Sequence, residues 1–132
     1  MNGIKEETKE DTMRRLIREN GLVQEDVFTM SRGGRNIPII TRAGIEKIEA
    51  NRKIEITYEI ELLDAPNKTC ILRALANMGD KHIQTFGSAT PANNTNAHFV
   101  EMAEKRARAR AVLMLAGFYQ EGYHSEDENL DA

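Results

Sequence analysis

The sequence predicts a small α+β domain in which a three-stranded antiparallel meander packs against a long C-terminal helix. Apolar and polar residues alternate strictly over 53–62, which is the pattern of a strand with one buried face. Two further strand-like runs, 69–77 and 81–89, follow after short turns, and short turns favour antiparallel pairing. Residues 96–116 are rich in Ala, Arg, Leu, Met and Glu, which are strong helix formers.

A helix is also expected near the N-terminus, over about residues 5–20. Met13, Leu16 and Ile17 would form a narrow apolar stripe on one face of it. The pair Asn20-Gly21 would end the helix, because both residues favour the conformation that terminates helices.

A short extended segment, 37–40, is expected after a loop that contains two adjacent glycines. Pro38 has no amide hydrogen to donate, so this segment is predicted at the edge of a sheet. An edge strand is also a candidate for pairing between subunits. Thr41 is then a suitable N-cap for a short helix over 42–51.

The long helix is expected to end at Gly117, which suits the left-handed residue that closes many helices. Three aromatic residues after it are expected to fold back on the core: Phe118, Tyr119 and Tyr123. Residues 121–132 contain five acidic residues and no Lys or Arg, and are predicted to be a flexible acidic tail. The domain is therefore expected to span residues 1–120, with its β-β-β-α core over about 37–118.

Composition limits the classes of protein to which the chain can belong. With 132 residues, of which 40% are hydrophobic, it can build one core. A single cysteine, Cys70, excludes an internal disulfide framework and a multi-cysteine zinc cluster. The longest apolar runs are too short to cross a membrane, and the N-terminus is charged where a signal peptide is apolar. A cytoplasmic protein is expected.

The net charge of −3 hides an uneven distribution. Residues 31–120 contain 13 basic and 9 acidic side chains, whereas residues 121–132 contain five acidic ones. The body is therefore mildly basic and the end of the chain acidic. This layout is compatible with a nucleic-acid partner.

Two arginines of the long helix, Arg106 and Arg110, fall within its apolar face when residues are placed 100° apart. An unpaired buried guanidinium is too costly to expect. Either each arginine pairs with a carboxylate, or this part of the face lines an open phosphate-binding groove.

Lys105 and Arg108 fall on the opposite, polar face of the long helix. Glu101 and Glu104 precede them by four residues, so each pair has the orientation that stabilises helices. A solvated, paired helix face is one interpretation of these residues, and contact with a nucleic acid is the other.

Several stretches together resemble a known family. They are the Asn94-Thr95 pair, EMAEKRA at 101–107, and Ala111-Val112-Leu113. They resemble a helix of phage and mobile-element proteins in the single-strand DNA annealing superfamily, which includes phage Erf, Red-beta and the eukaryotic annealing mediator of recombination. The segment IPIITRAGIEKI, at 37–48, is similar to the start of the same domain, and the acidic end after Phe118 is similar too.

The resemblance implies a β-β-β-α core, subunits that form rings or filaments, and single-stranded DNA held without any bond being made or broken. Arginine suits this task because its planar fork holds phosphate at two points, and the aromatic content of 5% favours backbone contact over base stacking. Candidate DNA-contacting residues come from the junction of the 42–51 helix with the first strand and from the long helix: Arg42, Arg52, Lys53, Lys105, Arg106, Arg108 and Arg110. The acidic tail could mimic DNA, or could simply be solvated.

Other functional classes fit the sequence less well. The chain has no GxGxxG, GxxxxGK[ST], HExxH or GxSxG motif, so no enzyme, catalytic residue, metal or cofactor is expected. Glu55, Glu59 and Glu61 share a strand face, which could hold Mg²⁺ in a nuclease but is explained more simply by solvation or by salt bridges with arginine. The main alternative function is an oligomeric protein-interaction module of a mobile element, without nucleic-acid activity.

Overall fold

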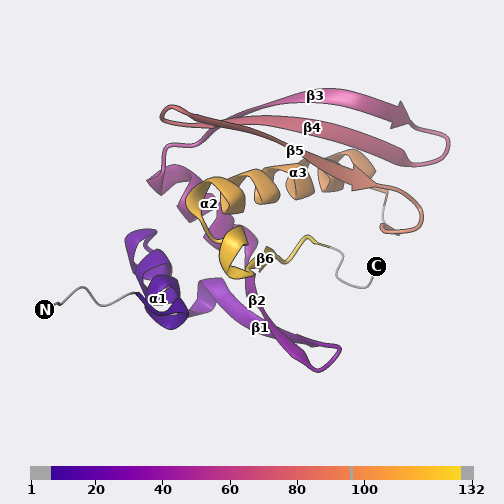
Figure 1. Cartoon of the computed structure of the whole chain (residues 1–132). Coiled ribbons are helices and arrows are strands. Elements are labelled where there is room, and N and C mark those ends of the chain that lie inside the picture. The colour runs from indigo at the N-terminus through magenta and orange to yellow at the C-terminus, as the bar shows by residue number, and fades with distance from the viewer. Residues whose placement is uncertain (1–6, 96, 129–132) are drawn as a thin grey trace, which may run out of the picture.

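The structure, a computed structural model, describes residues 7–95 and 97–128. Its elements are arranged in layers, with a sheet at the top, helices in the middle, and a second sheet at the bottom (Figure 1). The elements, in chain order, are α1 (Lys9–Glu19), η1 (Gln24–Asp26), β1 (Val27–Arg32), β2 (Arg35–Ile40), α2 (Arg42–Asn51), β3 (Glu55–Asp64), β4 (Thr69–Met78), β5 (Lys81–Ala89), α3 (Phe99–Ala116), η2 (Tyr119–Glu121) and β6 (His124–Ser125). The predicted α+β class is confirmed.

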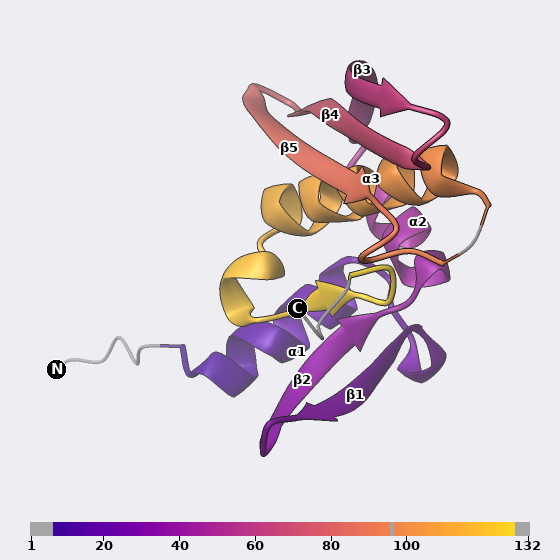
Figure 2. The ribbon, with the colours of Figure 1, turned by 90° about the vertical axis from the view of Figure 1, so that its right-hand side faces the viewer.

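The upper sheet is the predicted antiparallel meander, in the order β3-β4-β5. Helix α3 crosses beneath it and packs mainly on β5 and β4 (Figure 2). The face of these strands turned toward α3 carries mostly small residues, among them Ala74, Ala76 and Gly87. Small side chains let the helix approach the sheet closely.

The apolar face that the alternation predicts for β3 is buried over only part of the strand. Ile54, just before the strand, is buried and Ile56 is half-buried. The register then shifts between Ile60 and Leu62, a β-bulge at the edge of the sheet. From the shift onward the large apolar side chains are exposed: Ile60, Leu62 and Leu63 are 64%, 45% and 51% exposed.

The lower sheet has the order β1-β2-β6. Strands β1 and β2 form a hairpin through Gly33-Gly34, both at positive φ, as a type I′ turn requires. The edge position predicted for 37–40 is wrong, because the parallel strand β6 pairs with Ile39 and Ile40. Pro38 tolerates this position because β6 begins to pair one residue later, so Pro38 faces β1 alone.

The start of α2 follows the predicted chemistry, whereas α3 begins at Phe99 without a side-chain cap. Thr41 caps α2, and its Oγ accepts a hydrogen bond from the amide of Gly44 at 3.1 Å. Thr8 caps α1 in the same way, through the amide of Asp11 at 3.0 Å. The helix predicted over 5–20 therefore begins at Lys9; residues 5 and 6 lie outside the described part of the chain.

The end of the chain differs most from the prediction. Gly117 adopts the expected left-handed conformation, with φ of 89°, and Tyr123 packs edge-to-face on Phe118 with ring centroids 5.2 Å apart. The next residues form β6 rather than a tail, and Ser125 and Asp127 are buried. The flexible tail predicted over 121–132 is thus wrong for 121–128, which belong to the domain. Residues 129–132 lie outside the described chain.

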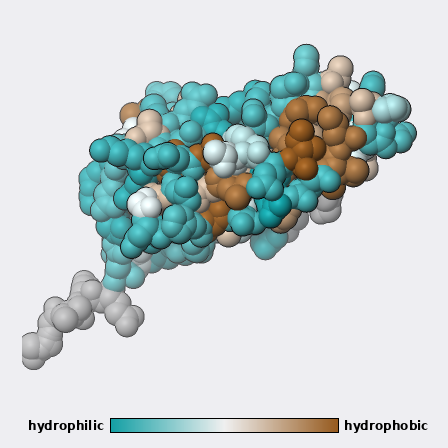
Figure 3. Space-filling model, turned by 90° about the horizontal axis from the view of Figure 1, so that it is seen from above, coloured by the Kyte–Doolittle hydropathy of each residue, from teal (hydrophilic) through white to brown (hydrophobic). Residues whose placement is uncertain are grey.

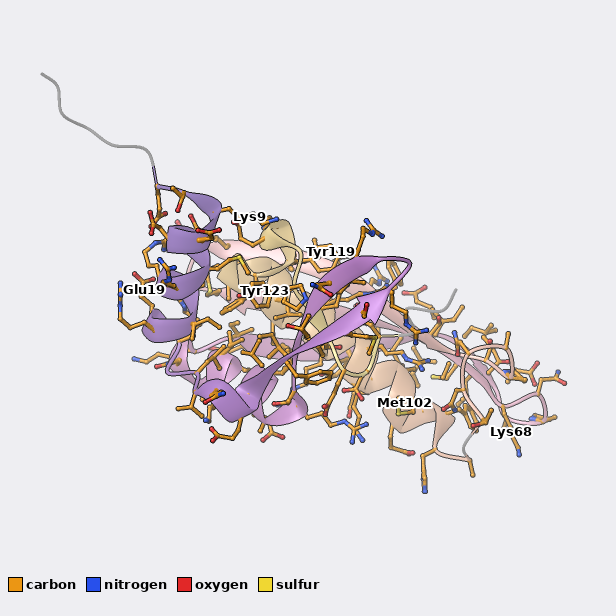
Figure 4. All side chains as sticks on the ribbon, turned by 90° about the horizontal axis from the view of Figure 1, so that it is seen from below. Lys9, Glu19, Lys68, Met102, Tyr119 and Tyr123 are labelled. Carbon is orange, nitrogen blue, oxygen red and sulfur yellow. The ribbon has the colours of Figure 1, made fainter. Side chains whose placement is uncertain are left out.

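Helix α1 and the turn between β3 and β4 lie at opposite ends of the molecule (Figure 4). Lys9 and Glu19 of α1 lie at one end, whereas Lys68, in the turn between β3 and β4, lies at the other (Figure 4). Tyr119 and Tyr123 lie nearer the α1 end (Figure 4).

Among the helices of residues 7–95 and 97–128, none has both the length and the apolar character needed to cross a bilayer.

Candidate nucleic-acid interface

The seven predicted contact residues occupy both ends of α2 and the middle of α3. Arg42 is the first residue of α2, and Arg52 caps its C-terminal end. A helix of ten residues is ~15 Å long, so these two arginines lie too far apart to share one phosphate. The structure therefore divides the predicted residues into two groups.

The smaller group, Arg52 and Lys53, lies beside α1. Arg52 donates from Nε to the side-chain oxygen of buried Asn20 at 2.9 Å, and its Nη2 lies 3.6 Å from Glu19. Lys53 has a positive φ of 54° and is exposed. It has no ion-pair partner among the described residues. A hollow of about 600 Å³ opens here, with Arg15, Arg52 and Lys81 on its walls.

Arg106, in the larger group, is buried and bonds to uncharged groups. Its Nε donates to the backbone carbonyl of Asp127 at 2.9 Å and its Nη1 to that of Ser88 at 2.8 Å. Asn93 accepts two more bonds, at its side-chain oxygen and its backbone carbonyl. Burial lowers the pKa of Arg106 below the usual arginine value. The carboxylate partner predicted by one alternative is not found for Arg106; it lines a surface hollow, but its guanidinium bonds to neutral protein groups.

Arg110 has the carboxylate partner that one alternative predicted. Its Nε and Nη2 donate to the two carboxylate oxygens of Glu128 at 2.9 and 3.1 Å, the two-point geometry typical of arginine. Its Nη1 donates to the carbonyl of Phe86 at 3.1 Å. The hydrogen bonds to Glu128 raise the pKa of Arg110. The acid comes from the C-terminal segment rather than from a strand or the N-terminus.

Arg42 binds the same C-terminal segment. Its Nε and Nη2 donate to one carboxylate oxygen of Asp127 at 2.9 and 2.7 Å, and the contact raises the pKa of Arg42. Its backbone N–H donates to the carboxylate of Glu126 at 3.1 Å. That N–H is at the start of α2, where the helix dipole favours a negative charge.

Arg108 and Lys105 do not form the predicted pairs within α3. Arg108 donates from Nε to Glu49 of α2 at 2.6 Å, so it joins two helices instead of bonding to Glu104. Lys105 is half-buried and has no ion pair within the described residues, and Glu101 lies 3.4 Å from His98 instead. Lys105 is thus a cation with no internal acid to neutralise it.

Five of the seven predicted residues gather where α2 meets α3. Two hollows adjoin there and share Arg42 and Asp127 as walls. Lys105 and Arg108 line one hollow, and Arg106 lines the other. Glu128 joins Arg110 to the same place. We call this group the cationic cluster: Arg42, Lys105, Arg106, Arg108 and Arg110.

Two of the three acids predicted as an alternative metal site, Glu59 and Glu61, bind an arginine instead. Glu59 and Glu61 both contact Nη2 of Arg73, at 2.9 and 2.7 Å. In residues 7–95 and 97–128, no group of three or more His, Cys, Asp and Glu side chains is placed to hold a metal ion. Burial raises the pKa of the Cys70 thiol, so its reactive thiolate form is disfavoured.

Sequence reasoning missed the residues that organise the cluster. Asn93 holds the guanidinium of Arg106 and also accepts a hydrogen bond from the amide of Thr90. The acids at 126–128 were visible in the sequence as a charge run, but nothing local predicts that they turn back onto α2 and α3.

No protein-family model, curated protein or solved structure matches this chain.

Proposed function

We propose that this chain is a non-enzymatic protein of phage or mobile-element recombination that binds and anneals single-stranded DNA. The observation that supports this function best is the cationic cluster. Five basic side chains from two helices meet beside hollows on the surface, although they lie as far apart in sequence as Arg42 and Arg110. Three of these cations, Arg42, Arg108 and Arg110, pair with acids of the same domain, so a polyanionic ligand would bind here by replacing acids.

The chemistry required is electrostatic. A strand held by its phosphates releases counterions, which drives binding, and it keeps its base edges free to pair with a complement. Arginine forks bind phosphate oxygens at two points. Lys105 would add a mobile point charge, because no acid among residues 7–95 and 97–128 forms an ion pair with it.

The β-β-β-α order of the upper layer also supports the proposal. This is the order that the resemblance to annealing proteins implies, and EMAEKRA at 101–107 lies on α3, next to the cluster. Arg52 and Lys53, at the junction of α2 with β3, would form a second contact region beside α1.

Binding to a fluorescein-labelled oligo-dT, followed by anisotropy over a series of salt concentrations, tests the proposal. We expect affinity to fall linearly in a log–log plot against salt, and single-stranded DNA to bind more tightly than a duplex. Lys105→Gln should weaken binding and reduce the salt slope by about 0.7, the value for one lost phosphate contact on a single strand. Lys9→Gln is the matched control, because Lys9 lies on α1, away from the cluster (Figure 4).

The proposal fails if the protein does not bind at low salt, and if a variant that lacks the acids at 126–128 does not bind either. Equal losses from Lys105→Gln and Lys9→Gln would show that general charge, and not the cluster, drives binding.

One observation favours the alternative, an oligomeric interaction module. The upper sheet exposes an apolar patch, brown in the view from above (Figure 3), and its exposed large apolar residues are Ile60, Leu62, Leu63 and Phe86. Three of these belong to β3, an edge strand that can pair with another chain. Light scattering with and without oligo-dT separates the two: defined oligomers that ignore DNA favour the alternative.

A further inference from the structure

The last described residues place three consecutive acidic side chains on the cationic cluster. We call Glu126, Asp127 and Glu128 the acidic strap. Glu126 accepts from the first amide of α2 and lies 3.7 Å from Arg42. Asp127 accepts two bonds from Arg42, and Glu128 accepts two from Arg110.

The donors that hold the strap are the kinds that hold phosphates. They comprise two arginine forks and a backbone N–H at a helix N-terminus, and all three bind phosphodiester oxygens well. They lie on two elements, α2 and α3, so an extended anionic chain meets them in succession. The strap therefore has the charge pattern of a short piece of nucleic-acid backbone.

The strap continues directly from β6 and is held on the cationic cluster by hydrogen bonds and ion pairs. Ser125 pairs with Ile40 in β6 and is fully buried. Past this point, the amide of Glu126 still donates to the carbonyl of Ile40, but the Glu126 side chain is one-third exposed. The ion pairs join it to Arg42 and Arg110, whose side chains are 53% and 42% exposed, while those of Asp127 and Glu128 are 4% and 10% exposed. Buried Arg106 also donates to the backbone carbonyl of Asp127 at 2.9 Å. The two exposed arginines are therefore accessible to an incoming anion, which would have to displace residues 126–128 while β6 stays paired.

We propose that the acidic strap is an internal competitor, which occupies phosphate positions on Arg42, Arg110 and the start of α2 until a single strand displaces it. This inference rests on the proposed function. It assigns the DNA phosphates to the positions that the strap carboxylates now hold. Binding then requires a nucleic acid with enough adjacent charge to replace three carboxylates, which disfavours short or isolated anions.

The first test neutralises the strap with Glu126→Gln, Asp127→Asn and Glu128→Gln together. The matched control changes the same residue types on exposed sites elsewhere: Glu25→Gln, Glu55→Gln and Asp80→Asn. Both variants alter the net charge equally. Anisotropy with labelled oligo-dT is measured for the wild type and both variants at several salt concentrations.

We expect the strap variant to bind at least tenfold more tightly than the wild type and the control at equal salt. Its salt slope should be steeper by about 2, because cations that were paired internally now release counterions, at about 0.7 for each phosphate on a single strand. Asp127 is buried, so a second variant, Glu126→Gln with Glu128→Gln, keeps the test valid if the triple variant does not fold.

The second test follows amide hydrogen exchange of the wild type. The amides of Glu126 and Glu128 donate to the carbonyls of Ile40 and Ser125. Adding oligo-dT should speed their exchange if the strap leaves, while the amides of α3 keep their protection.

The outcomes separate the two proposals. If the wild type binds DNA, but neither strap variant binds more tightly than the control and exchange at 126–128 does not rise, the competitor role is wrong and the proposed function stands. If neither the wild type nor the strap variants bind at low salt, the proposed function is wrong and the competitor role falls with it. Tight binding by the strap variants alone supports both.

Discussion

Arg106 and Arg110, one helical turn apart on α3, donate to the carbonyls of Ser88 and Phe86, two residues apart on β5, at 2.8 and 3.1 Å. The spacings match, because four helical residues rise ~6 Å and two strand residues ~6.8 Å. Strand β5 is an edge of the upper sheet. Two carbonyls of this edge strand are therefore occupied by the helix of the same domain, which leaves β3 as the more open edge of this sheet.

Replacing Arg106 with lysine should destabilise the fold, although it keeps the charge. One ammonium group cannot reach Ser88, Asn93 and the Asp127 carbonyl together, so buried acceptors lose their donors. We expect the free energy of unfolding to fall by about 3 kcal/mol. Urea denaturation measures it. Arg108→Lys is the control: Arg108 is one-third exposed and bonds to Glu49 alone, so it should cost below about 1 kcal/mol. Equal losses would contradict the role assigned to Arg106.

Replacing Gly87 with alanine should separate β5 from α3. A Cβ at this position would lie 2.1 Å from the carbonyl oxygen of Ala103 and 2.4 Å from the amide nitrogen of Ala107. Both are backbone atoms of a helix and cannot move singly, so we expect a loss of about 3 kcal/mol, at the upper end for overpacking. The urea midpoint of Ser88→Ala, one residue along, should stay close to that of the wild type. A stable Gly87→Ala variant would show that the helix can shift.

The sequence predicts the individual helices and strands better than it predicts which elements lie next to one another. The alternation of β3, the N-cap at Thr41 and the αL glycine at 117 are local signals, and each appears where it was expected. The contacts that place Pro38 in a central strand are not local, because β6 is a two-residue strand more than 80 residues further along the chain. No periodicity can be seen in so short a segment.

The partners of the arginines could not be predicted for a related reason. Helical geometry correctly placed Arg106 on the buried face of α3, but its acceptors are backbone carbonyls and Asn93, which carry no charge signal in the sequence. Arg108 binds Glu49 on α2 rather than the acid nearest to it in the sequence, Glu104. A pair within one helix is worth a few tenths of a kcal/mol, so tertiary packing easily overrides it.

The C-terminal segment should contribute to stability as a part of the core. Tyr123 is 3% exposed and packs on Phe118, whereas Tyr119 is 39% exposed. Tyr123→Ala should therefore reduce the free energy of unfolding by about 3 kcal/mol, and Tyr119→Ala by less than about 1 kcal/mol. Urea titrations of the two variants give the comparison. Equal small effects of the two substitutions would instead support the flexible tail that the sequence predicts. For the same reason, deleting residues 121–132 would test folding as well as DNA binding, and substitutions within the strap are the cleaner experiment.

Acid should destabilise the protein partly through Asp26. This carboxylate is buried, and it accepts bonds from Nζ of Lys47 at 2.7 Å and from the amide of Val23 at 2.9 Å. Desolvation opposes its ionisation, but these bonds outweigh desolvation and hold the pKa of Asp26 below its ordinary value of 3.8. The unfolded chain then binds the proton more readily than the folded one. The stability from this group is therefore complete above the unfolded pKa and is lost as the pH falls toward the lower folded pKa.

Asp26→Asn removes that titration, so stability should depend less steeply on pH below about pH 5. At neutral pH the variant should be less stable by about 2 kcal/mol, because the ammonium of Lys47 loses its charged acceptor. Urea midpoints measured from pH 3 to pH 7 test both points. Glu25→Gln, next to it in η1 and exposed, is the control and should retain the wild-type slope. A slope unchanged by Asp26→Asn would mean that other carboxylates account for the acid sensitivity.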